Sequence, residues 1–339
     1  MLSRFYKNLD AFTLGYEGQL RLQLVRRREA QLAAVFEQTA SHELLSYGPL
    51  DSAQERWLQR TLNQAGEQLA QIRERLFANA DIQRHHLVLD LNAGNGLLTW
   101  EVLRRVPEGG VYAFATTATD AIALQEQTQA LPDLQRPLVL QGDLTQLTDL
   151  LQAQAPKVQF DWIIGRNCFL RVADKTTLAV QLRPRLHPLG QVLLADVIPQ
   201  QGQRLYGLLS DKDVETKLMK RWRQAEERIY DPKVGDPLLN WDVSTLSAAF
   251  ERAGFTVSLD VEPLVRALYV TPQLIARWFE PGVERCSYGD RLRDMLTPKE
   301  VERVRALITQ FLCRQTVQWS SPMVYIRARL ASGSATGTM

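Results

Sequence analysis

Histidine and cysteine are scarce in this chain of 339 residues, which has four of the former and three of the latter. The cysteines lie far apart and form no CxxC pair, so the sequence predicts neither a disulfide framework nor a zinc site. This usage is typical of a reducing compartment, and we expect a cytoplasmic protein. No run of about 18 apolar residues occurs, and the charged N-terminus lacks the apolar centre of a signal peptide. The sequence therefore predicts no membrane span and no membrane partner.

The chain also lacks an excess of charge of one sign, because 40 basic residues stand against 38 acidic residues. This balance indicates no obligatory acidic or nucleic-acid partner. Two basic clusters, at residues 26–28 and 217–223, could contact phosphates, and Trp222 in the second cluster could stack on a base. Acidic residues surround the second cluster, which favours a solvated helix face over a nucleic-acid site.

The first part of the chain has no convincing strand, and we expect a helical N-terminal extension over residues 1–80. Within it, apolar residues at spacings of three and four form a single helical stripe. The stripe consists of Leu58, Leu62, Ala65, Leu69, Ile72 and Leu76.

From His86 onward, short apolar runs alternate with helical stretches. The runs cover residues 87–91, 111–115, 137–141, 160–164 and 191–196. Such alternation predicts a doubly wound α/β domain, whose mostly parallel sheet is covered by helices on both faces. Two further strands, at 255–261 and 323–330, bring the sheet to seven. We expect this Rossmann-like domain over residues 81–262 plus 319–330, with a helical insertion over 263–318.

The most informative segment joins the first predicted strand to the first helix of this domain, and it reads DLNAGNG from Asp90 to Gly96. Gly94 and Gly96 allow a sharp turn and let a ligand approach the main chain. The N–H groups of the following helix face the crevice at the strand ends, where open α/β sheets bind nucleotides. Thr99 replaces the third glycine of a dinucleotide-binding loop, which argues against a nicotinamide dehydrogenase. A tight turn without a ligand is the simpler alternative.

The pattern apolar-apolar-Asp-x-x-x-Gly-x-Gly resembles motif I of the class I S-adenosylmethionine-dependent methyltransferases. Residues 141–144, 160–167, 182–196 and 246–255 resemble four further segments of that family, in the same order. The resemblance implies a seven-stranded sheet, methyltransferase activity and S-adenosylmethionine as the cofactor. It implies that the cofactor is bound by Asp90, Asn92, Ala93, Gly94, Gly96, Thr116, Asp143 and Leu144.

The end of the second predicted strand departs from the family pattern. The family places an acid there that holds both ribose hydroxyls, but residues 114–119 read FATTAT. Asp120 is expected in the first turn of the next helix, where an acid is favoured without any ligand. A hydroxyl such as that of Thr116 makes a weaker bond, so we expect cofactor affinity to fall by about one to two decades.

Methyl transfer depends mainly on positioning, and some acceptors also require a general base. Two residues that end strands are the catalytic candidates. Asn167 follows the fourth strand and either orients an acceptor or caps a loop, and Asp196 ends the fifth strand as a base or as a capping acid. His85, His86 and His187 precede strands and fall at the opposite edge of the sheet, His42 lies in the N-terminal extension, and Cys168 is better read as a packing residue.

Two functions are compatible with these patterns. The first is an enzyme that binds S-adenosylmethionine and methylates an acceptor that the sequence does not identify. The alternative is a catalytically weak or inactive methyltransferase-fold module that acts in binding or regulation, for instance in nucleic-acid metabolism. The missing strand-two acid favours the alternative, whereas the intact glycine loop and Asp143 favour the enzyme. The chain also resembles the methyltransferase-like region fused to an AAA ATPase in some cyanobacterial proteins, although it contains no Walker motif. The sequence does not predict the oligomeric state.

Overall fold

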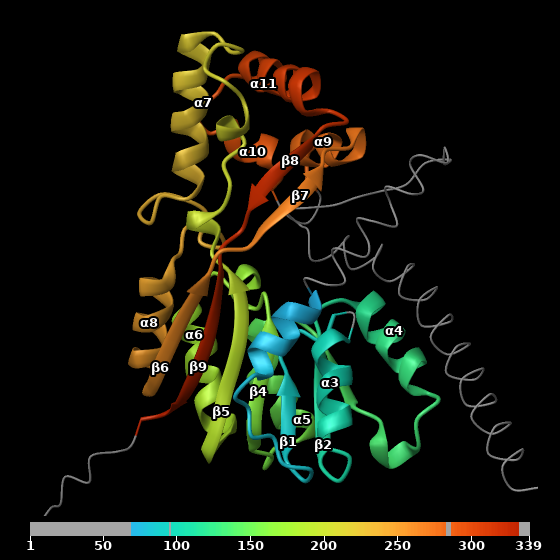
Figure 1. The fold of residues 1–339 in the computed structure, drawn as a ribbon. Coiled ribbons are helices and arrows are strands. Elements are labelled where there is room, and N and C mark those ends of the chain that lie inside the picture. Colours follow the sequence, from blue (N-terminus) through green and yellow to red (C-terminus); the bar gives the residue numbers. More distant parts are fainter. Residues whose placement is uncertain (1–68, 95, 283–285, 332–339) are drawn as a thin grey trace, which may run out of the picture. The chain divides into compact units, whose positions relative to one another are not determined.

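The computed structural model describes residues 69–94, 96–282 and 286–331, all within one unit that spans residues 68–339 (Figure 1). Most of the expected N-terminal extension therefore lies outside the described residues. Its last part, residues 69–77, is helical as predicted, and it buries Ile72, Leu76 and Phe77. Among the described residues, every helix is too short or too polar to cross a bilayer.

The larger of the two sheets in the described part of the chain has seven strands (Figure 1). Its strands are β1 (Leu87–Asp90), β2 (Gly110–Ala115), β3 (Leu138–Gln141), β4 (Phe160–Arg166), β5 (Leu186–Val197), β6 (Phe255–Glu262) and β9 (Met323–Leu330). Their order in the sheet is β3-β2-β1-β4-β5-β9-β6. Only β9 runs antiparallel to its neighbours in this sheet, whereas β1 to β5 are parallel. The predicted fold class, a doubly wound and mostly parallel seven-stranded sheet, is confirmed.

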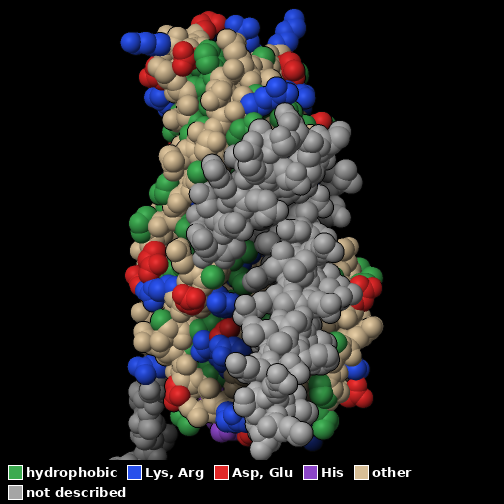
Figure 2. Space-filling view, turned by 45° about the vertical axis from the view of Figure 1, so that its right-hand side comes forward, with side chains coloured by type: hydrophobic (Ala, Val, Ile, Leu, Met, Phe, Trp, Pro, Cys, Tyr) green, Lys and Arg blue, Asp and Glu red, His purple; other side chains and the backbone are tan. Residues whose placement is uncertain are grey.

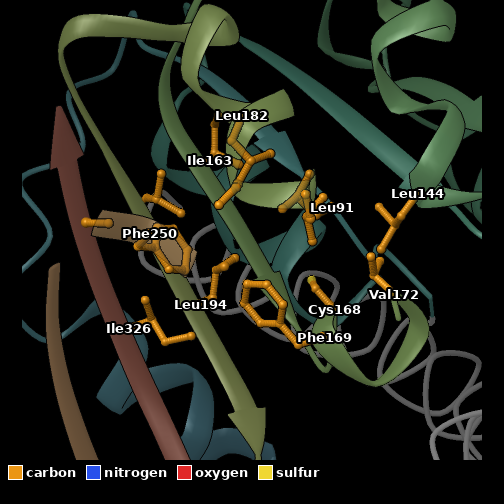
Figure 3. Packing of buried hydrophobic residues seen from close by; sticks show 14 of the residues in the cluster. Leu91, Leu144, Ile163, Cys168, Phe169, Val172, Leu182, Leu194, Phe250 and Ile326 are labelled. Carbon is orange, nitrogen blue, oxygen red and sulfur yellow. The ribbon is translucent and has the colours of Figure 1, made fainter. Parts of the chain in front are cut away.

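Helices cover both faces of the sheet because successive strand residues point to opposite sides. On one face pack α5 (Leu147–Gln154), α6 (Lys175–Leu182) and α8 (Val243–Arg252). On the other face pack the 69–77 helix, α3 (Leu97–Arg105) and α4 (Ala118–Thr128). Figure 3 shows the first of these layers, where Phe250 of α8 and Leu182 of α6 meet Ile163, Leu194 and Ile326 of the strands.

The chain leaves this sheet twice to build a second hydrophobic core, which we call the second core. It consists of α7 (Thr216–Ile229), α9 (Pro272–Phe279), α10 (Tyr288–Leu292) and α11 (Pro298–Leu312), with a two-stranded ribbon of β7 (Val265–Tyr269) and β8 (Thr316–Ser320). Its buried side chains come from residues 205–239 and 268–319. Short 3-10 turns complete the described part of the chain at Asp133–Gln135, Leu144–Gln146, Phe169–Arg171, Arg183–Arg185, Pro199–Gln201 and Tyr206–Leu208.

The insertion expected to be helical over residues 263–318 is therefore only partly helical. It contains α9, α10 and α11, but it begins with β7 and ends with β8. The antiparallel ribbon forms because β6 leads into β7 and β8 leads back into β9, so the two strands continue a pair that is already adjacent. Residues 205–239 also pack with the insertion, which was not predicted from the sequence.

Backbone hydrogen bonds tie the second core to the carboxyl end of β5. Ile198 N–H donates to the Pro322 carbonyl, and Gln203 N–H donates to the Ser320 carbonyl, both at 2.8 Å. Ser321 N–H donates to the Leu264 carbonyl at 2.8 Å. These segments follow β5 and β6 and precede β9, so the second core adjoins the sheet edge at which the parallel strands end.

Glu226 is the buried acid around which part of the second core is organised. Its carboxylate accepts hydrogen bonds from Leu205 N–H at 2.6 Å, Tyr206 N–H at 3.1 Å and the Tyr288 hydroxyl at 2.7 Å. The Tyr288 hydroxyl in turn accepts a bond from Trp222 Nε1 at 2.6 Å. Burial raises the pKa of Glu226 to about 7, and these donors oppose the increase.

We expect Glu226→Ala to lower the free energy of unfolding by about 3 kcal/mol, because three buried donors lose their acceptor. Urea denaturation followed by circular dichroism measures the effect. The matched control is Glu215→Ala, which removes an exposed acid at the start of α7 that makes no capping bond. A loss no larger than that of the control would contradict the role given to Glu226.

Candidate functional site

The loop between β1 and α3 is a tight left-handed turn that lies against β2. Gly94 and Gly96 have φ of 45° and 80°, in the region that favours glycine. Ala93 N–H donates to the Phe114 carbonyl of β2 at 2.9 Å, and Gly96 N–H donates to the Ala93 carbonyl at 2.6 Å. The two glycines therefore occupy the backbone conformation that the sequence predicted for them.

The surroundings of the two glycines differ. A Cβ atom on Gly96 would lie 2.7 Å from Nε1 of Trp100, so protein atoms fill that side. A Cβ atom on Gly94 would have Asn92 O, at 3.8 Å, as its nearest neighbour outside the adjacent residues. With respect to the residues that the structure describes, Gly94 thus presents open backbone, whereas Gly96 is needed for packing.

Asp90 supports this loop from inside the protein. Its side chain is fully buried, with one carboxylate oxygen accepting from Asn92 N–H at 3.2 Å and the other from the Thr99 hydroxyl at 2.8 Å. Burial raises the pKa of Asp90 to about 6. Asn92 extends the support to the next strand, because its Nδ2 donates to the Arg166 carbonyl at 2.7 Å. Thr99, at the position of a third glycine, therefore holds the carboxylate.

At the end of β2, the two threonines have different partners. Thr117 caps α4, where its hydroxyl accepts from Asp120 N–H at 3.1 Å and donates to the Asp120 carboxylate at 2.9 Å. Asp120 thus lies in the first turn of a helix, as predicted. The hydroxyl of Thr116 is buried and has no hydrogen-bond partner among the described residues. Thr116 therefore leaves an unused polar atom at the place where the methyltransferase family has an acid.

At the end of β3, Asp143 and Leu144 have separate roles. Asp143 is exposed and caps the following 3-10 turn, with one carboxylate oxygen accepting from Thr145 N–H at 2.8 Å and from the Thr145 hydroxyl at 2.6 Å. Gln146 completes this capping box. The Leu144 side chain is buried in the core beneath, close to Val172 in Figure 3. At this edge of the sheet, Leu144 therefore offers only its backbone.

Asn167 joins the ends of β4 and β5. It has φ of 54°, its N–H donates to the Ala195 carbonyl at 2.9 Å, and its side-chain oxygen accepts from Val197 N–H at 3.4 Å. Only 7% of the residue is exposed. These contacts fit the loop-capping alternative for Asn167.

Asp196, at the end of β5, is fully buried. One of its oxygens accepts from Phe169 N–H at 2.8 Å, and the other has no hydrogen-bond partner in the described part of the chain. Burial raises the pKa of Asp196 to about 7, while Phe169 N–H and the charges of Lys175 and Arg166 oppose the increase. The carboxylate can therefore exchange a proton near neutral pH.

Arg166, at the end of β4, is a partly buried cation that was not predicted from the sequence. Burial lowers its pKa, whereas the negative charges of Asp196 and Asp90 raise it. Electrostatic interactions therefore connect the acids of β1 and β5 through the end of β4. The signal in the sequence was an arginine directly after the apolar run of the fourth strand.

Most of these groups lie at the ends of β1, β2, β4 and β5, four parallel strands that are adjacent in the sheet: the glycine loop, Thr116, Arg166, Asn167 and Asp196. Asp143 follows β3, the remaining parallel strand of this group. They therefore share the carboxyl edge of the sheet, as the sequence predicted for the loop and the strand ends. The histidines lie elsewhere: His86 precedes β1 and accepts from Trp162 Nε1 at 3.0 Å, and His187 lies 4.0 Å from Asp161.

The remaining candidates contribute nothing visible to this edge. Cys168 is buried, and burial raises the pKa of its thiol well above the ordinary value, which fits the packing role. Trp222 is fully buried, so the stacking on a base considered for it is not available in this structure. His42 and residues 26–28 lie outside the described residues.

No protein-family model matches the chain. No curated protein matches it either. Solved structures resemble it at low identity. A Bacillus halodurans protein described provisionally as a methyltransferase is 15% identical, with a TM-score of 0.45 over 77% of this chain and 99% of its own. The YcgJ protein of Bacillus subtilis is 15% identical, with a TM-score of 0.44 over 79% of this chain and 100% of its own.

A third similar structure is phosphoethanolamine N-methyltransferase 2 of Haemonchus contortus, solved with S-adenosylhomocysteine and phosphomonomethylethanolamine. It is 14% identical, with a TM-score of 0.42 over 78% of this chain and 53% of its own.

The titration of Asp196 should be visible in the pH dependence of stability. Its folded-state pKa of about 7 exceeds the ordinary value of 3.8, so the folded protein retains a proton that the unfolded chain releases. This contribution makes wild-type stability fall as the pH rises through that window. We expect Asp196→Asn, which keeps an oxygen for Phe169 N–H, to gain about 2 kcal/mol relative to wild type between pH 5 and pH 8.

Urea denaturation of both proteins at these two pH values measures the difference. The control is Asp149→Asn, at an exposed position in the first turn of α5, which should change stability equally at both. A constant difference between Asp196→Asn and wild type would refute the assignment.

Proposed function

We propose that this chain binds S-adenosylmethionine at the 90–96 loop and transfers its methyl group to an acceptor. The observation that carries the proposal is the open left-handed backbone at Gly94, between β1 and α3. From β1 the chain adds β2 and β3 on one side of the sheet, and it then adds β4 and β5 on the other side. Open α/β sheets bind ligands at such a switch point, outside the carboxyl ends of the strands.

The polar groups around this point fit an adenosyl ligand. The backbone of Gly94 allows close approach, and the Thr116 hydroxyl at the end of β2, which has no partner among the described residues, supports a contact with a ribose hydroxyl. The exposure of Asp143 at the end of β3 supports a contact with the adenine amino group. Asp90 acts indirectly, since both of its oxygens already hold the loop.

When bound, the sulfonium cofactor supplies a methyl group that is already activated, so the protein has mainly to position the acceptor. The elements available for this are the segment after β4 and the second core, which adjoins the same edge of the sheet. Asn167 and Asp196 are the proposed acceptor-side residues. Both bond to backbone groups of neighbouring segments, so we infer that they first fix the shape of this half of the site.

Calorimetric titration with S-adenosylhomocysteine, the demethylated product, tests the proposal directly. We expect binding at micromolar affinity in the wild type and its loss in Gly94→Val, because the new side chain occupies the open space beside the loop. The matched control is Gly207→Val, at an exposed turn of the second core, which should bind like wild type. No binding up to millimolar ligand, or unchanged affinity in Gly94→Val, would reject the assignment.

A substitution at the end of β2 should increase the affinity for S-adenosylhomocysteine if the proposal is correct. Thr116→Asp introduces the acid that the methyltransferase family has at this place, and a charge-assisted bond to the ribose should strengthen S-adenosylhomocysteine binding about tenfold. Thr119→Asp adds the same charge on the exposed first turn of α4 and serves as the control. Equal affinities of the two variants in the same titration would show that the ribose does not lie at Thr116.

A further inference from the structure

Lys175 is a buried lysine whose hydrogen-bonding capacity is fully used. Its residue is only 4% exposed, and its Nζ donates to the carbonyls of Phe169, Val172 and Pro237. The bonds to Phe169 and Pro237 are both 2.9 Å long. A buried ammonium is costly unless all of its donors have partners, and here all three have them. Nζ also lies 5.4 Å from the centre of the Trp241 ring.

Lys175 and Asp196 hold the same residue from its two sides. Phe169 N–H donates to Asp196, and the Phe169 carbonyl accepts from Lys175. The bond from Lys175 to Val172 fixes the end of the same segment. Two buried side chains therefore hold residues 166–172: the Lys175 ammonium on α6 and the Asp196 carboxyl group on β5. This segment carries Arg166 and Asn167 at the carboxyl edge of the sheet.

The third bond of Lys175 reaches a different part of the chain. Pro237 lies in the segment that leads from the second core to α8. Its neighbour Asp236 accepts from Nε and Nη2 of Arg291 on α10, at 2.9 Å and 2.6 Å. A continuous series of hydrogen-bonded and covalently adjacent groups thus runs from the segment after β4, through Lys175 and residues 236–237, to α10.

We propose that Lys175 is a positioning residue that holds the 166–172 segment in its binding shape and couples it to the second core through Pro237. The part of this inference that concerns ligand binding rests on the proposed function. The coupling itself follows from contacts that involve no ligand. Without the ammonium, three buried carbonyls in two distant segments lose their donor, so both segments should loosen together.

Hydrogen exchange measured by mass spectrometry on the full chain tests the coupling. In Lys175→Met, we expect amides in residues 167–172 and 236–240 to exchange about tenfold faster, while those of β1 and of residues 160–165 in β4 keep their protection. Lys175→Arg, which retains the charge, should restore part of the protection in both segments. Lys157→Met, at an exposed lysine, is the control and should change neither.

Binding of S-adenosylhomocysteine provides the second measurement. We expect Lys175→Met to weaken it about tenfold at a temperature where the variant is fully folded, with partial rescue in Lys175→Arg. If the wild type does not bind, the proposed function fails, and the exchange data still decide the coupling. Faster exchange in one segment alone, uniformly faster exchange, or unchanged protection would overturn the coupling. Unchanged affinity in a Lys175→Met protein with both segments loosened would overturn the positioning role.

If Lys175→Met does not fold, exchange of the wild type in increasing urea replaces it. Segments that depend on the same contact open in one cooperative step, so both should show the same opening free energy and the same dependence on urea. Two separate openings would overturn the proposal.

Discussion

The candidate site depends on the burial of a carboxylate at the end of the first strand. Asp90 holds both ends of the glycine loop, through Asn92 N–H on one side and the Thr99 hydroxyl on the other. A carboxylate without these donors would be too costly in this position, and the loop without the carboxylate would lose its two attachments. The left-handed backbone at Gly94 and Gly96 follows from this arrangement, because the chain must turn within a few residues to enter α3. The accessible backbone at Gly94 thus depends on the hydrogen bonds that the buried Asp90 carboxylate accepts beneath the loop.

The same constraint recurs at the ends of the neighbouring strands. Asp196 is also buried, and it accepts a backbone N–H instead of facing solvent. Arg166 and Lys175 supply positive charge close to these acids, which reduces the cost of burying them without removing it, since both acids keep raised pKa values. The carboxyl edge of the sheet is therefore a network of charged groups that shape backbone segments, and the side chains that a ligand can touch directly are fewer.

Much of this could be predicted from the sequence, because the relevant signals are local. Apolar runs separated by helical stretches identified β1 to β5, and two glycines after a buried aspartate identified the loop. The absence of an acid after β2 also proved informative, since the Thr116 hydroxyl has no hydrogen-bond partner in the part of the chain that the structure describes. The interpretation of Thr99 was incomplete: the sequence showed that a glycine was missing, but only the fold brings Thr99 against Asp90.

The features that the sequence did not reveal all depend on contacts between distant segments. Lys175 follows a helix cap and resembles any solvated lysine in the sequence, yet it bonds to Pro237, which is 62 residues away. The ribbon of β7 and β8 is formed by two five-residue strands separated by three helices, so no local turn signal marks their pairing. Residues 205–239 likewise belong to the second core only because the segments after β5 and β6 leave the sheet at the same edge.

This division between local and distant contacts has a consequence for recognition. The groups proposed for the cofactor come from the loops after β1, β2 and β3. The loops after β2 and β3 are fixed by contacts at their own strand ends, and the loop after β1 is also bonded to the end of β4 through Asn92. The groups proposed for the acceptor side follow β4 and β5, and their shape depends on Lys175 and on a segment of the second core. Changes in the second core would therefore act first on the acceptor side and reach the glycine loop through the hydrogen bond from Asn92 to the Arg166 carbonyl. Under the proposed function, the shape of the acceptor side therefore depends on how the two cores are joined as well as on the groups at the strand ends.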